Sequence, residues 1–448
     1  MKKLFFSVFL LHAMAQAQVI IKKDSAIAAM VAAVNADSLR SYVQQMVAFG
    51  TRNTLSTQQD PKRGIGAARN WVLNKFNGYR TTAGGRLSAF IDTVTILPDG
   101  KRVNKKIILG NVVATLKGTD PADNRIFLIS GHLDNRRSDV MDADKDAPGA
   151  NDDASGVAAL IECARIMSSR KFSATVIFVA VSGEEQGLLG AEHMSSRALR
   201  EKWNIEGVLN NDIVGSNNSN GTRIINNTQV RVFSESLSVL DTGNAAKQIR
   251  SLGLENDGKS RQLARYIKEI GERYVDNLQV VMVYRNDRFL RGGDHTPYVL
   301  KGFPAVRITE MNENYDHQHQ DVRMEQGTQY GDLIGFMDFE YLRKNTAMNL
   351  ANLANLSSAP AMPGDVTVDT KNLTNFTDLS WSAPVSGKVE GYYVLVRETI
   401  SPVWQKKIFT TEKSIHLNYS KDNYFFAVQA VNSAGNESLP VLPLPVRN

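Results

Sequence analysis

The sequence predicts an α/β domain with a mixed, mostly parallel sheet flanked by helices, followed by a small all-β sandwich. From Ile107 to about Ala347, strand-like apolar runs alternate with helix-like segments. Examples are strand 126–130, helix 155–168, strand 175–181 and helix 187–199. Such alternation is typical of a sheet covered by helices on both faces. Beyond residue 364, short and regularly spaced strand-like segments favour a β-sandwich.

The chain begins with a pattern typical of a secretory signal peptide. Lys2 and Lys3 precede the apolar run 4–11, and Ala15-Gln-Ala17 supplies the small residues of a cleavage site. That apolar run is far shorter than the ~20 residues that cross a bilayer. No later segment is long and apolar enough to span, so we expect a secreted or periplasmic protein without a transmembrane segment.

Composition shifts divide the rest of the chain. We expect the signal peptide at 1–17, a larger domain with an N-terminal lead-in at 18–356, a linker at 357–364 and the β-sandwich at 365–448. The lead-in has helical spacing of apolar residues at 38–47 and 65–76 and strand-like alternation within 84–105. The linker is marked by its Ser, Ala, Pro and Gly residues.

Bulk properties exclude some classes of function. The net charge is +6, but the basic residues are scattered, so no nucleic-acid partner is expected. The single cysteine, Cys163, lies among apolar residues of a predicted helix. We therefore expect a buried core residue and not a nucleophile.

Histidines and carboxylates follow the predicted strands of the larger domain. His132 and Asp134 follow strand 126–130, Glu184 and Glu185 follow strand 175–181, and Asp212 follows the apolar segment 207–209. Asp152 precedes the helix at 155–168, and His317 and His319 follow the apolar run 304–308. Because the ends of parallel strands converge at one crevice, we expect these groups to meet. Two histidines with four or more carboxylates indicate a two-metal hydrolytic site.

Each motif also has a structural interpretation. Asp152 and Asp153 precede Ser155 and suit the N-terminus of a helix, with Asp153 the better candidate for the capping role. A pair such as Glu184-Glu185 is often a charged surface, but here it lies just beyond a predicted buried strand. The sequence contains neither a Gly-x-Ser-x-Gly nor a His-Glu-x-x-His motif, so neither of these catalytic motifs competes with the two-metal interpretation.

These motifs resemble the M28 family of zinc exopeptidases, which includes bacterial leucyl aminopeptidases, over roughly residues 40–345. The resemblance implies that His132 and Asp212 bind a first metal, that Asp152 bridges two metals, and that Glu185 binds the second. It makes Glu184 the general base. It also implies that Asp134 accepts a hydrogen bond from the second imidazole nitrogen of His132. Two Zn²⁺ ions per chain are expected, although the ligands also suit manganese or cobalt.

The last metal ligand has two candidates. His317 lies four residues before Asp321 and matches the family's His-x-x-x-Asp arrangement, whereas His319 lies two residues before it. We prefer His317 and keep His319 as the alternative. His295 resembles another recurrent family segment, with a structural or substrate-facing role.

The C-terminal segment resembles a fibronectin type III module through Trp381, Gly391-Tyr-Tyr-Val and Tyr424-x-x-x-Val428. The resemblances together imply an exported di-zinc exopeptidase that acts on peptides, with an aminopeptidase preferred. One alternative is a glutaminyl cyclase-like acyltransferase with a single zinc. Another is a surface-binding or adhesion protein whose module contacts cell surfaces or polymers. If the module is only an accessory, deleting residues 360–448 leaves hydrolysis intact.

Overall fold

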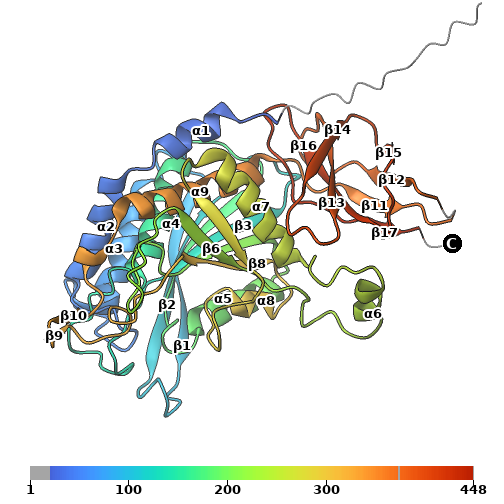
Figure 1. Cartoon of the computed structure of the whole chain (residues 1–448). Helices are drawn as coiled ribbons and strands as arrows, with labels where there is room; N and C mark the ends of the chain where they lie inside the picture. Colours follow the sequence, from blue (N-terminus) through green and yellow to red (C-terminus); the bar gives the residue numbers. More distant parts are fainter. Residues whose placement is uncertain (1–20, 372–373, 447–448) are drawn as a thin grey trace, which may run out of the picture.

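The computed structural model describes residues 21–371 and 374–446. The predicted signal peptide at 1–17 lies outside these ranges. Within them, no helix combines the length and the apolar character needed to cross a membrane. Figure 1 shows a large α/β body with a smaller β module packed at one side.

The large body is built on an eight-stranded mixed sheet. The four central strands are parallel to one another, whereas β1 and β2 form an antiparallel hairpin at one edge. In spatial order the strands are β1 (Leu87–Ile96), β2 (Ile107–Leu116), β4 (Thr175–Val181), β3 (Arg125–His132), β5 (Asn204–Asn211), β8 (Ala305–Glu310), β6 (Gln229–Phe233) and β7 (Gln279–Val283).

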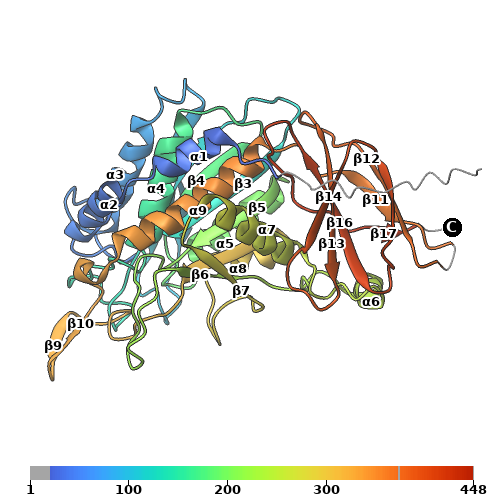
Figure 2. The ribbon, with the colours of Figure 1, turned by 45° about the horizontal axis from the view of Figure 1, so that its top comes forward.

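Helices cover both faces of this sheet. The larger hydrophobic core lies between one face of the sheet and the helices that Figure 2 shows along the upper side. A second hydrophobic core lies on the other face, beneath α5 and α8. The helices are α1 (Ser25–Ala32), α2 (Ala36–Ala48), α3 (Gly64–Gly78), α4 (Ala154–Ser168), α5 (Leu189–Arg200), α6 (Gly243–Ser251), α7 (Lys259–Tyr274), α8 (Thr296–Val299) and α9 (Phe339–Ser358).

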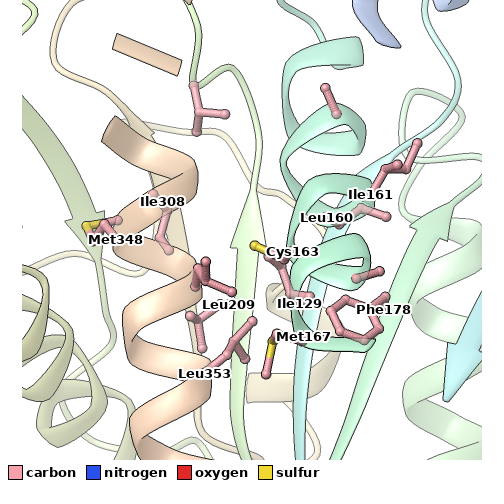
Figure 3. Packing of buried hydrophobic residues seen from close by; sticks show 14 of the residues in the cluster. Ile129, Leu160, Ile161, Cys163, Met167, Phe178, Leu209, Ile308, Met348 and Leu353 are labelled. Carbon is pink, nitrogen blue, oxygen red and sulfur yellow. The ribbon is translucent and has the colours of Figure 1, made fainter. Parts of the chain in front are cut away.

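The centre of the larger core is the contact of α4 and α9 with the sheet. Leu160 and Met167 of α4 and Leu353 of α9 pack near Ile129 and Leu209 of the central strands (Figure 3). Cys163 is fully buried between the two helices, which confirms its prediction as a core residue. These apolar contacts hold the central strands in place and with them the loops at their ends.

Most of the predicted elements are present. The helix expected at 155–168 is α4, and the strand expected at 175–181 is β4 with the same ends. The sequence did not single out α7 or the small hairpin of β9 (Arg323–Glu325) and β10 (Thr328–Tyr330). A short 3₁₀-helix, η1 (Ile334–Phe336), precedes α9, and α9 extends into the first two residues of the expected linker.

The C-terminal module is a sandwich of a four-stranded and a three-stranded sheet. Its core surrounds Trp381, which packs edge-on against Tyr392 with ring centroids 5.4 Å apart. The strands are β11 (Gly364–Val368), β12 (Thr377–Ser382), β13 (Gly391–Glu398), β14 (Lys406–Thr410), β15 (Ser414–Leu417), β16 (Tyr424–Val431) and β17 (Leu444–Pro445).

The module docks on α7 through two buried charge clusters. In the first, Asp257 lies 2.7 Å from Arg265 of α7 and accepts hydrogen bonds of 2.6 and 2.8 Å from Arg397 of β13. In the second, Glu437 of the module pairs with Arg273 of α7 at 2.8 Å and with Lys407 at 2.5 Å. We call these two groups together the docking clusters. They fix the module to the helix that covers the sheet.

The start of the described chain also touches the module. Lys22 donates to the carbonyl of Ser433 at 3.1 Å, and the Asn436 side chain donates to Asp24 at 3.0 Å. Asp24 is also the N-cap of α1. Residues from the two ends of the described chain therefore lie side by side (Figure 1).

Candidate metal centre

The carboxyl ends of the central parallel strands converge as the sequence predicts. β3 ends at His132, β4 is followed by Glu184 and Glu185, and β5 is followed by Asp212. Two groups of side-chain donor atoms meet there. One contains His132, Asp152 and Asp212, and the other contains Asp152, Glu185 and His319. Within each group the donor atoms all lie within 4.8 Å of one another.

Asp152 is common to both groups and lies between them. Its Oδ1 is 3.0 Å from His132 Nε2, and its Oδ2 is 2.9 Å from His319 Nε2. Each carboxylate oxygen therefore faces a different histidine. This is the geometry of a carboxylate that can offer one oxygen to each of two cations.

His319, and not His317, reaches the second group. His319 Nε2 lies 3.0 Å from Glu185 Oε1. His317 instead stacks on Phe336, with ring centroids 3.7 Å apart, and Asp321 accepts a hydrogen bond from Arg137 at 3.0 Å. The preference for His317 is therefore corrected in favour of His319.

The conformation of the local backbone explains why His319 reaches the second donor group and His317 does not. The segment around these histidines is a series of turns, and His319 has a left-handed backbone with a φ of 57°. Such a conformation is uncommon for a residue other than glycine, and it redirects the side chain in a way that residue spacing does not reveal.

Asp134 contacts His132 through its backbone and not through its carboxylate. The carbonyl oxygen of Asp134 lies 3.0 Å from His132 Nδ1, whereas its Oδ1 is 3.9 Å away. The expected carboxylate contact with the imidazole is thus replaced by a carbonyl contact, which fixes the ring equally well.

The Asp134 carboxylate has another task. It accepts hydrogen bonds from the backbone N–H groups of Gly183, Glu184 and Glu185 at 2.9, 3.2 and 3.1 Å. Thr54 donates to the same carboxylate at 3.0 Å. Asp134 therefore shapes the turn that presents the two glutamates.

Asp153 and Asp332 brace the loop that carries Asp152. Asp153 caps α4 by accepting from Gly156 N at 3.0 Å, as the sequence suggests, and it also accepts from His132 N at 2.8 Å. Asp332 accepts from the backbone N–H of Asp152 at 2.7 Å. No sequence pattern singled out Asp332, which lies beyond the β9–β10 hairpin.

Glu184 differs from Glu185 in having no partner for its carboxylate among the described residues. Its side chain is half-buried and lines the cleft above the two donor groups. Within residues 21–371 and 374–446 its carboxylate forms no hydrogen bond or ion pair. Burial raises the pKa of Glu184 well above its ordinary value, and the neighbouring Glu185 and Asp212 add to the rise while His132 opposes it.

Asp212 rests on a buried arginine. Its Oδ2 lies 2.6 Å from Arg307 Nη1, and its Oδ1 lies 3.8 Å from His132 Nε2. Burial acts to raise the pKa of Asp212, but Arg307 and His132 outweigh burial and hold the pKa below its ordinary range. Ile213, which follows, has a left-handed backbone with a φ of 52°. This is a strained conformation for a β-branched residue, and strain of this kind accumulates at functional sites.

Behind Arg307 lies a buried polar group that sequence reasoning did not predict. Asp294 is fully buried, neither of its carboxylate oxygens forms a hydrogen bond in the described structure, and burial raises its pKa to about 8. His295 is also fully buried and pairs through Nε2 with the carbonyl of Asn286 at 2.8 Å. Its role in the structure is therefore internal support and not ligation.

The surrounding carboxylates raise the pKa values of both histidines. Burial acts to lower the pKa of His319, but Glu185 and Asp152 outweigh it and raise the pKa to about 10. Burial likewise opposes the rise at His132, where Asp153, Asp152 and Asp212 raise the pKa well above its ordinary value. Both shifts show that the carboxylates of the site favour positive charge between them.

The donor atoms fit divalent cations. Each group offers one imidazole nitrogen and two carboxylates, a set of three protein ligands that zinc accepts with a position left open. Glu185 Oε1 is buried, and the one partner that the described structure gives it is His319 Nε2 at 3.0 Å, the other side-chain donor that would share its cation. The same donors also suit manganese or cobalt.

A cleft opens above these groups. His132, Asp152, Glu184, Glu185 and Asp212 line its floor. Its walls carry four arginines and several apolar residues, among them Leu290 and Tyr315, which are 91% and 55% exposed. The arginines are Arg102, Arg136, Arg288 and Arg291. The cleft can therefore admit an extended polar chain with apolar side chains.

Comparisons with known proteins show the family of each domain. Residues 111–331 match Peptidase family M28, and residues 359–445 match the Fibronectin type III domain. A probable zinc metalloprotease of Leptosphaeria maculans is 42% identical over 94% of this chain and 97% of its own length. One of Pyricularia oryzae is 43% identical over 94% of this chain and 85% of its own length.

Solved structures share the fold. The LapA aminopeptidase of Legionella pneumophila superposes with a TM-score of 0.53 at 20% identity, over 77% of this chain and 78% of that chain. A second structure from that organism, LapB, gives a TM-score of 0.51 at 16% identity and covers 75% of each chain. At these identities the likeness concerns the fold alone.

Proposed function

The chain belongs to peptidase family M28, with a C-terminal fibronectin type III domain, and within this family of zinc metallopeptidases we propose that it is an exported di-zinc aminopeptidase. The observation that carries the proposal is Asp152, whose two oxygens face His132 at 3.0 Å and His319 at 2.9 Å. The substrates are peptides. Export rests on the pattern of residues 1–17.

We assign the ligands by the two donor groups. His132 and Asp212 would hold one zinc ion, Glu185 and His319 would hold the other, and Asp152 would contribute to both sites. Bound there, the ions would supply a water of lowered pKa and a Lewis acid for the peptide carbonyl. Two donor groups favour this function over a cyclase-like acyltransferase with one zinc.

The chain's own residues perform the proton transfers. Glu184 takes a proton from the attacking water on its carboxylate and gives that proton to the leaving amine. Its raised pKa suits the second half of this cycle, because the protonated carboxyl must persist until the amine leaves. Asp134 holds Glu184 in place through the hydrogen bond to its backbone N–H.

The test is mass spectrometry of a mixed peptide pool incubated with the zinc-loaded protein, with and without a chelator, beside Glu184→Gln. We expect ladders that lose residues from the N-terminus and that vanish with the chelator and in the variant. Glu412→Gln, an exposed change in the C-terminal domain, is the matched control and should cleave normally.

Other outcomes would redirect the proposal. Ladders from the C-terminus would keep the mechanism and replace the aminopeptidase with a carboxypeptidase. Loss of ammonia from N-terminal glutamine without cleavage would indicate the cyclase. An untouched pool with two zinc ions present would contradict a general aminopeptidase and favour a binding role for the fibronectin type III domain.

A further inference from the structure

Four arginines line the walls of the cleft, and they differ in how their charge is balanced. Arg288 lies 3.0 Å from Glu313 and 3.2 Å from Asp287, and Arg291 lies 3.4 Å from the same Glu313. Glu313 also lies 2.8 Å from Arg231, so these carboxylates offset part of the charge of Arg288 and Arg291 and hold both side chains in the wall of the cleft.

Arg102 and Arg136 have no such partner. Arg102 donates from Nη1 to the carbonyl oxygen of Glu185 at 2.6 Å. Arg136 donates to the carbonyl oxygens of Arg137 and Ser138 at 2.9 and 2.7 Å. Neither forms an ion pair with any residue in 21–371 or 374–446. Carbonyl contacts hold a guanidinium in place without neutralising its charge.

Arg137, the residue after Arg136, differs from Arg136 because it does form ion pairs. Arg137 lies 3.0 Å from Asp321 and 3.5 Å from Asp142 and is thus paired with carboxylates. Of these arginines, only Arg102 and Arg136 line the cleft without a carboxylate partner among the described residues.

The unpaired positive charge of Arg102 lies close to the candidate metal centre. Arg102 comes from the loop between β1 and β2 and is anchored on the backbone of Glu185, beside the second donor group. The four carboxylates of the floor face two histidines and, in the loaded protein, divalent cations that offset their charge. The two arginines then remain as uncompensated positive charge at the walls, where the field attracts anions.

We propose that Arg102 and Arg136 form a carboxylate-binding subsite, so that the enzyme prefers peptides carrying a carboxylate close to the residue that it removes. Guanidinium groups bind carboxylates through paired, charge-assisted hydrogen bonds, and both arginines keep N–H groups available for them. The carboxylate can be the C-terminus of a short peptide or an acidic side chain. This substrate class rests on the proposed peptidase function.

The test compares four peptides that share the N-terminal residue that the wild type removes fastest. One ends in a free carboxylate (X-Ala-Ala), one is its neutral amide, one is an amide with an internal Glu and one is the same amide with Gln. We expect at least one carboxylate peptide to exceed its neutral partner about fivefold to tenfold in kcat/KM, mainly through KM, with the excess falling at high salt. The two pairs separate the C-terminal from the side-chain source.

The variants locate the preference. Arg102→Gln with Arg136→Gln should abolish the excess, measured within each variant as the ratio of the kcat/KM of a carboxylate peptide to that of its neutral partner. The corresponding double lysine variant should keep part of this ratio. Arg200→Gln, an exposed change on α5 away from the cleft, is the matched control. Equal hydrolysis of carboxylate and neutral peptides by the wild type would overturn the proposal. An excess that survives the double glutamine variant would overturn it too.

A binding measurement separates this proposal from the peptidase function itself. Calorimetric titration of X-Ala-Ala and its amide into zinc-loaded Glu184→Gln protein should show tighter binding of the free carboxylate. Adding the two arginine substitutions should remove the difference. If the wild type cleaves none of the peptides, the proposed function fails, and equal binding of the two peptides would then overturn the subsite as well.

Discussion

The docking clusters and the candidate metal centre both bury charged side chains, but they differ in how many cationic partners each buried carboxylate has. In the docking clusters, Asp257 faces Arg265 and Arg397, and Glu437 faces Arg273 and Lys407. Each buried anion there has two cationic partners from the chain itself. Such clusters need no other component, and they fix one domain on the other.

The candidate metal centre lacks that balance. Asp152, Glu184, Glu185 and Asp212 converge on His132 and His319, and one arginine, Arg307, supports Asp212 from behind. Buried carboxylates that their own protein leaves short of cations are stable when metal ions supply the missing charge. Both regions contain buried acidic and basic side chains. A structural cluster pairs each carboxylate with cations of the protein, whereas a metal-binding cluster leaves carboxylates for the metal.

The largest effect is expected from removing the shared carboxylate. Asp152→Asn takes one ligand from both donor groups, so both zinc ions should be lost and peptide hydrolysis should fall about a thousandfold or more. Metal analysis and initial rates measure this. Asp144→Asn, on an exposed loop nearby, should change neither. A variant that keeps two ions would show that Asp152 is not a bridge.

A docking-cluster variant should behave in the opposite way. Asp257→Asn leaves Arg265 and Arg397 buried without their anion, so the free energy of unfolding should fall by about 3–5 kcal/mol. Zinc content and the kcat of the folded protein should stay normal. Thermal melts with Asp276→Asn as an exposed control would measure the loss. A drop in zinc content would mean that the two regions are coupled.

The same reasoning changes the expectation for domain deletion. Without residues 360–448, Arg265 loses the carbonyl of Pro402 and Arg273 loses Glu437. We therefore expect the shortened chain to unfold at a lower temperature, although its donor groups remain complete. Wild-type stability in the deleted protein would contradict the structural role of the docking clusters.

Metal removal should have the next largest effect. A cation present at one hundred times its dissociation constant stabilises the folded protein by about 2.7 kcal/mol per site. Chelation should therefore lower the melting temperature of the wild type and of Asp257→Asn by a similar amount, because the two regions act independently. Asp152→Asn should show little further change. Calorimetric scans with and without the chelator test this.

The smallest effect is expected from pH. Since Glu185 and Asp152 raise the pKa of His319 to about 10, zinc would have to displace a proton from this histidine at neutral pH. Metal affinity should therefore fall about tenfold per pH unit for each protonated histidine on acidification. Proton release on zinc binding, measured by calorimetry in buffers of different ionisation enthalpy, should confirm the sign.

The docking clusters should withstand the same acidification. Burial acts to raise the pKa of Glu437, but Lys407 and Arg273 outweigh it and lower the pKa. Its contribution to stability is present above the ordinary glutamate pKa and is lost only as the pH falls through the lowered value. Zinc should therefore dissociate before the domains separate. Hydrogen exchange of α7 at decreasing pH would detect the opposite order.

Sequence reasoning succeeded where the chain is regular. The apolar runs of β3, β4 and β5 fix the strands, and the rule that parallel strand ends converge brings His132, Glu185 and Asp212 together. The requirement for a helix cap likewise identified Asp153. In each case one physical rule connects a local pattern to a position in space.

It failed where irregular backbone decides the outcome. The left-handed residue His319 and the stacking of His317 on Phe336 depend on turns that residue spacing does not describe. The contacts of Asp332 with Asp152 and of Asp257 with Arg397 join segments 180 and 140 residues apart in sequence. No periodicity reports such contacts, because they arise only once separate elements have packed.

The contact between Lys22 and Ser433 and that between Asn436 and Asp24 join residues 411 and 412 positions apart. During translation, Lys22 and Asp24 are therefore made about four hundred residues before their partners. The N-cap of α1 has its full set of contacts only after Ser433 and Asn436 have been made, and closing so large a loop is entropically slow. Nascent chains halted before residue 433 should leave the region around Asp24 open to proteolysis, whatever the state of the central sheet.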